Sequence, residues 1–441
     1  MKIGIIGLGF VGLSLTSVLS SKDFDVVGID IDEEKCKKIS NGIIPFFEPD
    51  LEKMLKNGLK KKLKITNDFS IIQNCDIIFV AVGTPQNKNG SIDLSIIKKV
   101  VSTIGENILK NKKKPIIIIK STVIPGTMEK IILPILEKKS NKKEGKDFGL
   151  ISNPEFLQES SAIRDTKFPH VVVLGGNQTQ FMKKAKKIFK KLHPNTPIII
   201  TNHQTAEIIK YANNSFLATK ISFINQLSNI CQKIPEANID DIGKTIGLDP
   251  RIGKLFLNAG PGYGGSCLPK DMKALINFAK TSGINPTLLN AVEEVNTKQL
   301  EQIILMIKQK LGNLASKKIT ILGTSFKPDT DDIRDSISIE LIKKLLKRKA
   351  LITIHDPKAI ENTKGVFGSK IKYSKSVKYA LSKSQCVIIM TQWKHYEKLN
   401  NNDFNDMAKK IVIDCRRMLI KKQLDVDYVA IGLGKKNWNT L

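Results

Sequence analysis

The sequence lacks the residue patterns that mark metal-binding, disulfide-rich and membrane-spanning proteins. Its six cysteines, at positions 36, 75, 231, 267, 386 and 415, contain no CxxC pair, and its five histidines stand apart from one another. We therefore predict neither a metal site nor a disulfide framework. No segment is long and apolar enough to span a membrane. These absences predict a cytoplasmic protein with no membrane partner.

Acidic residues are scarce beside basic ones. Asp and Glu number 42 against 71 Lys and Arg, which gives a formal net charge of +29. Such an excess is typical of nucleic-acid binding, but aromatic residues make up only 6% of the chain and none alternate with the lysine-rich stretches. We therefore expect no nucleic-acid partner and interpret the charge as a field that favours anionic ligands. A length of 441 residues predicts two or three domains.

The N-terminus carries a dinucleotide-binding fingerprint. Residues 2–7 are predicted as a buried strand and 11–19 as a helix, with Gly7-Leu-Gly-Phe-Val-Gly12 between them. These glycines serve a tight turn, close approach of the backbone to a pyrophosphate, and packing of helix on strand. A second strand, 25–30, ends in Asp30, which favours NAD over NADP. The alternatives are a Rossmann-like fold without a nucleotide and a signal peptide, but a signal peptide does not need this glycine spacing.

Further apolar runs end in small polar residues. Strands predicted at 77–82 and 116–120 are followed by Gly83-Thr84 and Ser121-Thr122, at the sheet edge where ligands of open α/β sheets bind. More strands are predicted at 149–153, 171–174 and 198–201. Glu155 and Glu159 would share one face if their segment is helical. Two acids on a solvated face are the alternative interpretation.

A long helix is predicted from about 205 to 233, roughly 42 Å in length for roughly 28 residues. Such a length indicates a spine between domains or a dimer surface. Lys210 and Asn214 lie four residues apart on one face of this helix. A solvated lysine is the alternative. Two more helices are predicted at 240–247 and 288–311.

The stretch Ala259-Gly-Pro-Gly-Tyr-Gly-Gly-Ser-Cys-Leu-Pro-Lys-Asp271 combines a compact glycine-rich backbone with a thiol. Such a backbone lets a ligand approach closely. Cys267 is followed by an apolar helical pattern, and Lys270 comes three residues later. A thiolate is stabilised at a helix N-terminus beside an ammonium group. The alternative is a glycine-rich loop that contains a cysteine by chance.

A second α/β unit begins at the strand predicted for 318–323. A helix is predicted at 336–349, and further strands at 351–355, 386–391 and 411–414 make a three-layer domain. This part has no GxGxxG, so a second ordinary NAD site is not expected. Lys327 and Arg334, on the loop after its first strand, suit phosphate groups. They could equally be plain surface charges.

Taken together, the motifs resemble those of the nucleotide-sugar dehydrogenases, in particular the group of UDP-glucose 6-dehydrogenases and GDP-mannose 6-dehydrogenases. Relatives that act on N-acetylated sugars usually have histidine before the cysteine and no PKD, whereas this chain has Ser266 and Lys270-Asp271. Besides GLGFVG and Asp30, the motifs are VGTP at 82–85, STVIPGT at 121–127, NPEFLQES at 153–160, KYANN at 210–214, GYGGSCLPKD at 262–271 and FKPDTDDIR at 326–334.

The resemblance implies an α/β protein with an N-terminal Rossmann NAD-binding domain (1–203), a central helical domain with a spine helix (204–312) and a C-terminal Rossmann-like domain for the nucleotide sugar (313–441). It implies an NAD-dependent enzyme that oxidises UDP-glucose to UDP-glucuronate through a thiohemiacetal and a thioester on Cys267. GDP-mannose is the alternative substrate, and residues 266 and 268 occur with both. A homodimer or larger homo-oligomer is expected.

Roles also follow from the resemblance, residue by residue, with Arg251 able to reach in from a partner subunit. The implied catalytic residues are Cys267, Lys210, Asn214, Asp271, Glu155 and Thr122. The implied NAD-binding residues are Gly7, Gly9, Phe10, Val11, Gly12, Asp30, Lys35, Thr84, Thr122, Glu159, Lys270 and Arg334. The implied substrate-binding residues are Glu155, Phe156, Leu157, Lys210, Asn214, Arg251, Asn258, Tyr263, Gly264, Phe326, Lys327 and Arg416.

The chain departs from the family pattern at two places. Ser160 stands where glycine is usual, and Asp414-Cys-Arg-Arg417 replaces Asp-Gly-Arg-Asn, beside the expected contact of Arg416 with the base or ribose. Two other classes remain as hypotheses. A two-electron alcohol or hydroxyacid dehydrogenase would not need Cys267, and an NAD-sensing or RNA-binding protein would need none of the implied catalytic residues.

Overall fold

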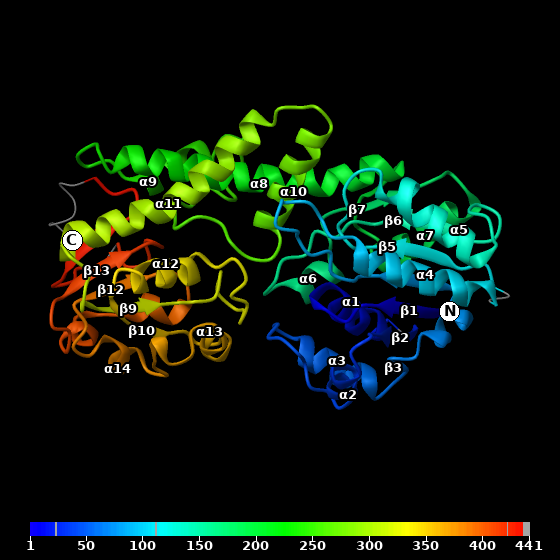
Figure 1. Cartoon of the computed structure of the whole chain (residues 1–441), viewed down its shortest axis with the longest axis horizontal. Helices are drawn as coiled ribbons and strands as arrows, with labels where there is room; N and C mark the ends of the chain where they lie inside the picture. Colours follow the sequence, from blue (N-terminus) through cyan, green and yellow to red (C-terminus); the bar gives the residue numbers. More distant parts are fainter. Residues whose placement is uncertain (23, 111–112, 421, 435–441) are drawn as a thin grey trace. The chain divides into compact units, whose positions relative to one another are not determined.

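The computed structural model describes residues 1–22, 24–110, 113–420 and 422–434. The chain divides into two compact units, residues 1–213 with 273–281 and residues 214–272 with 282–441. The division falls within two helices, α8 (His203–Cys231) and α10 (Leu268–Thr281). Figure 1 labels the helices and strands of the chain.

Unit 1 is built on an eight-stranded sheet with strand order β3-β2-β1-β4-β5-β6-β7-β8. Neighbouring strands are parallel except β6 and β7, which pair antiparallel. The strands are β1 (Lys2–Ile6), β2 (Asp25–Ile29), β3 (Leu63–Thr66), β4 (Ile77–Val80), β5 (Ile116–Ile119), β6 (Gly149–Ser152), β7 (Val172–Gly175) and β8 (Ile198–Thr201).

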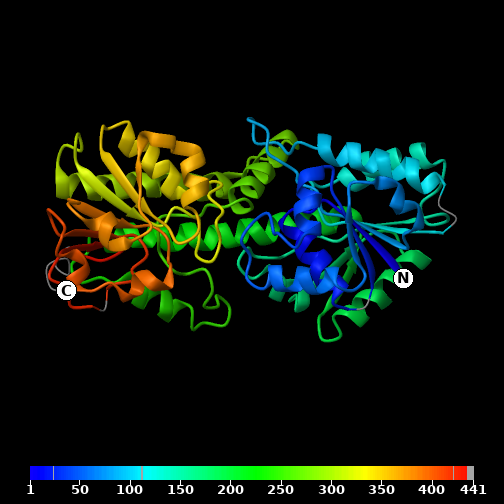
Figure 2. The ribbon, with the colours of Figure 1, turned by 90° about the horizontal axis from the view of Figure 1, so that it is seen from below.

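Helices cover both faces of this sheet (Figure 2), which explains its apolar strands. In β5, for example, Ile116 and Ile118 pack into one core and Ile117 and Ile119 into the other. One face is covered by α1 (Phe10–Ser20), α2 (Glu33–Ser40), α3 (Leu51–Leu59), α6 (Ala162–Lys167) and α7 (Gln180–Leu192). The other is covered by the 3-10 turn Phe69–Asn74, α4 (Ser95–Leu109), the π-helical turn Met128–Ile132 and α5 (Leu133–Ser140).

Unit 2 contains a six-stranded parallel sheet with strand order β11-β10-β9-β12-β13-β14. The strands are β9 (Lys318–Leu322), β10 (Leu351–His355), β11 (Lys372–Tyr373), β12 (Cys386–Ile389), β13 (Ile411–Asp414) and β14 (Asp427–Ala430). The helices are α9 (Ile239–Ile246), α11 (Thr287–Leu311), α12 (Ile337–Leu346), α13 (Ile360–Phe367) and α14 (Val377–Leu381), with 3-10 turns at Gly368–Lys370, Lys394–Lys398 and Asn401–Phe404. Separate apolar clusters fill the two faces of this sheet.

The two sheets begin in the same way. Gly7 (φ +91°) follows β1 and Gly323 (φ +94°) follows β9, and both turns require the left-handed conformation that glycine accepts. Asp30 accepts the N–H of Leu8, and Asp356 accepts the N–H of Thr324. The Asp356 carboxylate is also engaged by three more backbone N–H groups, a serine hydroxyl and an indole N–H. Its oxygens are therefore saturated within unit 2.

The predicted α/β architecture is confirmed, and the spine helix exists as α8 at His203–Cys231. One local expectation is wrong, because residues 153–158 form no helix and Glu155 and Glu159 share no helical face. Instead, Glu48 accepts the N–H groups of Ser160 and Ala162, both at 2.7 Å, which fixes an irregular turn. Ser160 has φ +68°, and this left-handed backbone explains why glycine is usual at its position.

Candidate active site

The N-terminus of α1 has the geometry of a pyrophosphate site. Gly9 precedes the helix, which has neither a side-chain cap nor an acidic residue in its first turn. A Cβ at Gly9 would meet nothing within 4 Å, so the backbone is open to a ligand. A Cβ at Gly12 would lie 1.8 Å from the Gly7 carbonyl oxygen, so helix and strand touch at this point. The free N–H groups and helix dipole therefore fit the phosphates of a dinucleotide.

Asp30 lies at the adjoining end of β2 and is 7% exposed. Its carboxylate accepts the Leu8 N–H at 2.8 Å and the Lys35 ammonium at 2.7 Å. Burial alone would raise the pKa of Asp30, but the Lys35 ammonium and the N–H groups of Leu8 and Asp32 outweigh it, so the pKa is lowered. The carboxylate is therefore ionised and fit to accept ribose hydroxyls. Half-buried Phe10 packs on Phe46 beside this edge, with ring centroids 5.4 Å apart.

The ends of β4 and β5 are joined by hydroxyl groups. The Thr84 hydroxyl donates to the Thr122 carbonyl oxygen at 2.8 Å, and the Ser121 hydroxyl donates to the Val82 carbonyl oxygen at 2.7 Å. Thr122 remains half-buried. Unit 1 thus brings Thr84 and Thr122 to the carboxyl edge of its sheet, where the sequence predicted them.

A buried ion pair lies in unit 1. The Lys210 ammonium is 3.1 Å from Glu155 Oε1, and the two side chains are 4% and 8% exposed. Lys210 also lies 5.4 Å from the centre of the Phe156 ring. The Leu157 N–H donates to the other oxygen of Glu155. Glu159 is buried as well, and Leu157 is half-buried. Unit 1 thus brings Glu155, Phe156 and Lys210 together.

Lys120 is a further basic residue of this region, and it was not predicted from the sequence. Its ammonium donates to Asn153 Oδ1 at 3.0 Å. Burial lowers the pKa of Lys120 to about 8, with Glu155 acting to raise the pKa and Lys210 to lower it. Its position directly after β5 and before Ser121-Thr122 is the signal that could have identified it.

Cys267 is exposed in unit 2 and directly precedes α10. Asp271, one turn further on, is 1% exposed. Its carboxylate accepts the Asn214 amide at 2.7 Å and the Lys270 ammonium at 2.5 Å. Asn214 itself lies one turn after Lys210 on the continuous helix α8. Unit 2 therefore gathers a thiol, a carboxylate, an amide and an ammonium around the first turn of α10.

The glycines before Cys267 pack against the loop that carries the FKPDTDDIR motif. A Cβ at Gly264 would lie 2.2 Å from the Asp335 carbonyl oxygen, and one at Gly265 would lie 2.6 Å from the Phe326 ring. The Gly265 N–H also donates to the Arg334 carbonyl oxygen at 3.1 Å. The cysteine loop and this second loop are therefore in direct contact within unit 2.

Unit 2 also contains an open pocket of about 270 Å³. Two predicted substrate residues, Asn258 and Arg416, line it. Arg416 Nε donates to the Met390 carbonyl oxygen at 2.7 Å, and burial lowers the pKa of the guanidinium to about 10. The remaining lining residues are Ile221, Asn225, Leu255, Phe256, Gly260, Gly262 and Gln392. A cationic, amide-lined pocket of this size suits an anionic, hydrogen-bonding ligand.

Arg417, where the family usually has asparagine, does not line this pocket. Its backbone adopts φ +58°. Its side chain is buried, with Nε 2.9 Å from Asp240 Oδ1, and also contacts Asn238 and the Ile431 carbonyl oxygen. Arg417 thus ties the end of β13 to the start of α9.

Other predicted residues in unit 2 have partners of their own. The Tyr263 hydroxyl donates to Glu293 Oε2 at 2.9 Å, and Lys327 lies 5.8 Å from the Phe326 ring centre. Arg251 and Arg334 are exposed, and each guanidinium is bound two-pronged by an aspartate two residues before it.

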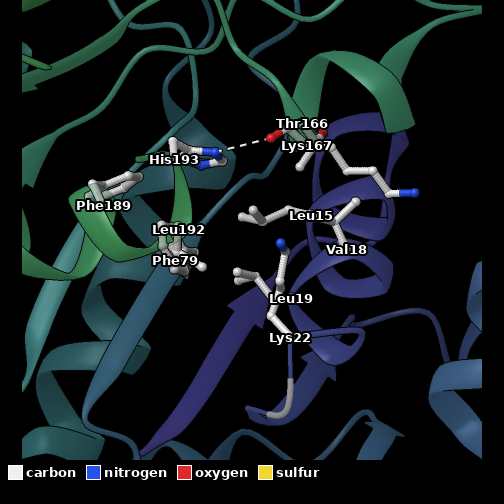
Figure 3. Close-up of a pocket in the computed structure, with 10 residues that line it drawn as sticks. All are labelled: Leu15, Val18, Leu19, Lys22, Phe79, Thr166, Lys167, Phe189, Leu192 and His193. Atoms are coloured by element: carbon white, nitrogen blue, oxygen red, sulfur yellow. Dashed lines mark hydrogen bonds between the residues drawn. The ribbon is translucent and has the colours of Figure 1, made fainter. Parts of the chain in front are cut away.

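A separate cavity in unit 1 is too small to be the site. It holds about 20 Å³, room for about one water molecule. Figure 3 shows its mostly apolar walls, with His193 Nδ1 3.3 Å from the Lys167 carbonyl oxygen at one end. It is lined by Leu15, Val18, Leu19, Lys22, Phe79, Thr166, Lys167, Phe189, Leu192 and His193. We interpret it as a gap in core packing.

Among the described residues, no group of three or more His, Cys, Asp or Glu side chains is arranged to hold a metal ion. None of the helices in that part of the chain has both the length and the apolar character needed to cross a membrane.

The cradle at α1 and Asp30 defines unit 1 as the NAD-binding part of an oxidoreductase. The chain belongs to the UDP-glucose/GDP-mannose dehydrogenase family. Residues 1–193 match its NAD binding domain, 204–298 its central domain and 320–421 its UDP binding domain.

Individual relatives are similar over nearly the whole chain. UDP-glucose 6-dehydrogenase AglM of Haloferax volcanii is 37% identical over 434 residues, covering 98% of this chain and 100% of that protein. UDP-glucose 6-dehydrogenase TuaD of Bacillus subtilis is 38% identical over 440 residues, covering 98% of this chain and 93% of that protein. A solved UDP-glucose dehydrogenase from Pyrobaculum islandicum has a TM-score of 0.91 and 30% identity, covering 98% of each chain.

Proposed function

We propose that this protein oxidises UDP-glucose to UDP-glucuronate with NAD, in a four-electron reaction that uses Cys267 as a covalent nucleophile. The observation that carries the proposal is the exposed thiol at the start of α10, one turn before an Asp271 carboxylate that binds Asn214 and Lys270. Family membership and relatives that are named for UDP-glucose support the choice of substrate.

The first half of the reaction converts the 6-hydroxymethyl group to an aldehyde. NAD, when bound, accepts the hydride in this step and again in the second oxidation. Asp271, or Lys210 in its neutral amine form, takes the hydroxyl proton directly or through water, and Lys210 becomes an ammonium if it is the base. Lys210 and Asn214 stabilise negative charge that develops on the sugar oxygen. The buried ion pair of Lys210 with Glu155 keeps the ammonium group in place.

The second half keeps the aldehyde bound. The Cys267 sulfur attacks the aldehyde carbon, and the new C–S bond gives a thiohemiacetal. Loss of a second hydride from the carbon, together with the proton of the hydroxyl group, leaves a thioester. Water then adds to the thioester carbon, the C–S bond breaks, and the thiol and a carboxylate are released. One water is consumed and two NADH form. Glu155 acts as an acid/base residue, and Thr122 and Asp271 help to position the water.

NAD and the nucleotide sugar are bound by different sets of residues. We assign the pyrophosphate of NAD to the α1 N-terminus and its ribose to Asp30. Other NAD contacts come from Phe10, Val11, Lys35, Thr84, Thr122, Glu159, Lys270 and Arg334. The nucleotide sugar is held by Phe156, Leu157, Arg251, Asn258, Tyr263, Gly264, Phe326, Lys327 and Arg416. In functional terms, residues 1–203 bind NAD, 204–312 carry the thiol, and 313–441 bind the nucleotide sugar.

We further propose a cytoplasmic homo-oligomer. Three apolar side chains at intervals of seven residues on α8, Phe216, Phe223 and Ile230, are 65%, 52% and 48% exposed. An apolar stripe of this kind on a long helix suits the same stripe of a second copy.

Steady-state assays with a panel of nucleotide sugars test the proposed activity. We expect turnover with UDP-glucose and two NADH per sugar oxidised. Turnover with GDP-mannose alone would replace UDP-glucose by the alternative substrate. Absence of NAD reduction with every nucleotide sugar, together with tight and steeply salt-dependent RNA binding, would favour the non-enzymatic class.

A Cys267→Ser variant tests the covalent step. We expect it to lose the complete reaction, since serine is a much weaker nucleophile than a thiolate. Cys231→Ala, at the last residue of α8, is the matched control and should keep its activity. Normal turnover of Cys267→Ser would instead indicate a two-electron dehydrogenase.

A further inference from the structure

We propose that Glu207 is a positioning residue for the reaction: its carboxylate fixes the loop that carries Thr122 and ties this loop to the turn of α8 that carries Lys210. The inference rests on the proposed roles of Thr122 and Lys210. All of these residues lie in unit 1.

The Glu207 side chain reaches from α8 to the end of the loop 121–128. Its Oε2 accepts the Gly126 N–H at 2.6 Å, and its Oε1 accepts the Met128 N–H at 2.8 Å. Glu207 is 2% exposed. Both carboxylate oxygens are therefore used, in a buried position, to hold one short stretch of backbone.

The carboxylate supplies a cap that the loop lacks. Thr127, which precedes the helical segment Met128–Ser140, makes no side-chain cap, because its hydroxyl donates to the Ile124 carbonyl oxygen at 2.6 Å. The first N–H groups of a helix need acceptors, and an anion is favoured there. Glu207 meets this need from another element of the fold.

The other end of the loop is held at the sheet edge. The Ser121 hydroxyl donates to the Val82 carbonyl oxygen, and the Thr84 hydroxyl donates to the Thr122 carbonyl oxygen. Thr122 thus lies between two anchors, one on β4 and β5 and one on α8. If the Glu207 anchor is lost, the loop is held at one end only.

Glu207 also lies three residues before Lys210, on the same side of α8. Its immediate neighbour Ala206 and Tyr211 are fully buried, so this turn of the helix cannot shift without repacking. Burial raises the pKa of Glu207 to about 7, with the nearby Glu129 acting in the same direction.

Glu207→Gln is the test, measured with the nucleotide sugar that the wild-type protein oxidises. A glutamine offers one acceptor oxygen in place of two, so one of the two N–H groups loses its partner. We expect kcat to fall about 10- to 100-fold, because a displacement of 1 Å has effects of this size. KM for both ligands should stay within about threefold. Glu129→Gln, an exposed neighbour bound to Gln204, is the matched control and should leave kcat unchanged.

A double-mutant cycle separates positioning from a general structural role. If Glu207 acts through the Thr122 loop, Glu207→Gln combined with Thr122→Ala will be no slower than Thr122→Ala alone, within about twofold. If the kcat losses of the two single variants multiply in the double variant, the proposal is overturned. It is also overturned if Glu207→Gln keeps the kcat of the wild type. Should Glu207→Gln fail to fold, Glu207→Asp, which keeps the charge but shortens the reach, takes its place in the same cycle.

Hydrogen exchange gives a readout that does not depend on activity. Amides of residues 121–128 should exchange faster in Glu207→Gln than in the wild type or Glu129→Gln. If the amides of residues 121–128 exchange at the same rate in Glu207→Gln as in the wild type, the proposal is overturned. This outcome does not depend on whether the protein oxidises a nucleotide sugar. Conversely, faster exchange in a protein without that activity would leave the loop anchor standing and reject the proposed function.

Discussion

At the residue scale, exposure sets Cys267 apart from the other cysteines. Cys36, Cys75, Cys231, Cys386 and Cys415 are all buried, and burial raises the pKa of each, to about 11 for Cys75. A buried, protonated thiol reacts slowly with alkylating agents. We expect iodoacetamide to label Cys267 of the native protein at least about tenfold faster than any other cysteine.

Peptide mass spectrometry after short exposures would measure this selectivity. In urea, where burial is lost, all six cysteines should label at similar rates. Equal labelling in the native protein would show that Cys267 is not activated. Protection of Cys267 by UDP-glucose would further indicate that the sugar lies against the thiol.

Replacing Glu207 by glutamine should affect stability and activity in opposite directions. At high pH the variant should gain stability relative to the wild type, although its kcat is lower. Its pKa is raised from 4.5 to about 7, chiefly by burial. Between these values the folded protein holds a proton that the unfolded chain has released, so this contribution to stability is present at low pH and lost as the pH rises through 7. At about 1.4 kcal/mol per pKa unit, the contribution amounts to at most about 3 kcal/mol.

Urea unfolding of wild type and Glu207→Gln at pH 5 and pH 8 measures the effect. Glutamine does not ionise, so the free energy of unfolding of Glu207→Gln relative to the wild type should rise by about 1–3 kcal/mol between these two values. A variant that is relatively more stable at pH 8 and yet slower would separate the two roles. Parallel pH profiles would show that Glu207 titrates near its ordinary value.

The sequence could identify residues that lie within motifs, but not residues whose role depends on burial. Asp30 follows a strand at a fixed distance from the glycines, and Cys267 opens an apolar helical pattern, so both were predictable. Glu207 and Lys120 are ordinary charged residues in sequence. What distinguishes them is enclosure by segments far away in the chain, such as Gly126 around Glu207.

At the element scale, the contact between the cysteine loop and the loop 326–334 predicts a strict need for glycine at 264. A Cβ at Gly264 would lie 2.2 Å from a backbone oxygen of Asp335, so one of the two loops would have to move. We expect Gly264→Ala to lower the free energy of unfolding by about 1–3 kcal/mol and to slow turnover.

Gly365→Ala is the matched control. Gly365 lies within α13, and a Cβ there would meet nothing within 4 Å. This substitution should leave turnover unchanged and raise the free energy of unfolding by up to about 1 kcal/mol, because alanine favours the helix. Equal effects of the two substitutions, measured by urea unfolding and steady-state assay, would contradict the proposed loop contact.

The exposed stripe on α8 makes a second prediction at this scale. Phe223→Glu would place a charge in the middle of the proposed contact between copies. We expect the molecular mass measured by light scattering to fall to that of a single chain. Lys364→Glu, at an exposed position on α13 and away from α8, is the control. An unchanged mass for Phe223→Glu would rule out this stripe as the interface.

Strands made mostly of isoleucine, valine and leucine were predictable, even at a sheet edge as for β8, whereas two short strands that contain lysine were not. The strands β8, β10 and β13 were predicted with their observed bounds. The edge strands β3 and β11 went unpredicted, because lysines interrupt them and part of each is exposed. The four-residue spacing of Glu155 and Glu159 suits a helix, but the segment 153–158 is irregular, and the turn after it is held by Glu48, more than 100 residues earlier.

At the scale of the whole molecule, the net charge of +29 has consequences for both proposed ligands. NAD and UDP-glucose each carry a pyrophosphate, so a positive field raises their local concentration and their association rates. Salt shortens the range of this field from about 10 Å at 0.1 M to about 3 Å at 1 M. We therefore expect KM for both ligands to rise several-fold over this range, with kcat changing less than about twofold.

The product provides an internal control for this electrostatic effect. UDP-glucuronate has nearly the same size and shape as UDP-glucose but carries one more negative charge, so the field acts on it more strongly. Its inhibition constant should therefore rise more steeply with salt than KM for UDP-glucose. Product-inhibition assays at several concentrations of two different salts would measure both slopes. Equal slopes would mean that the excess charge lies too far from the bound sugar to act on it, and that it serves the protein in some other way, such as solubility.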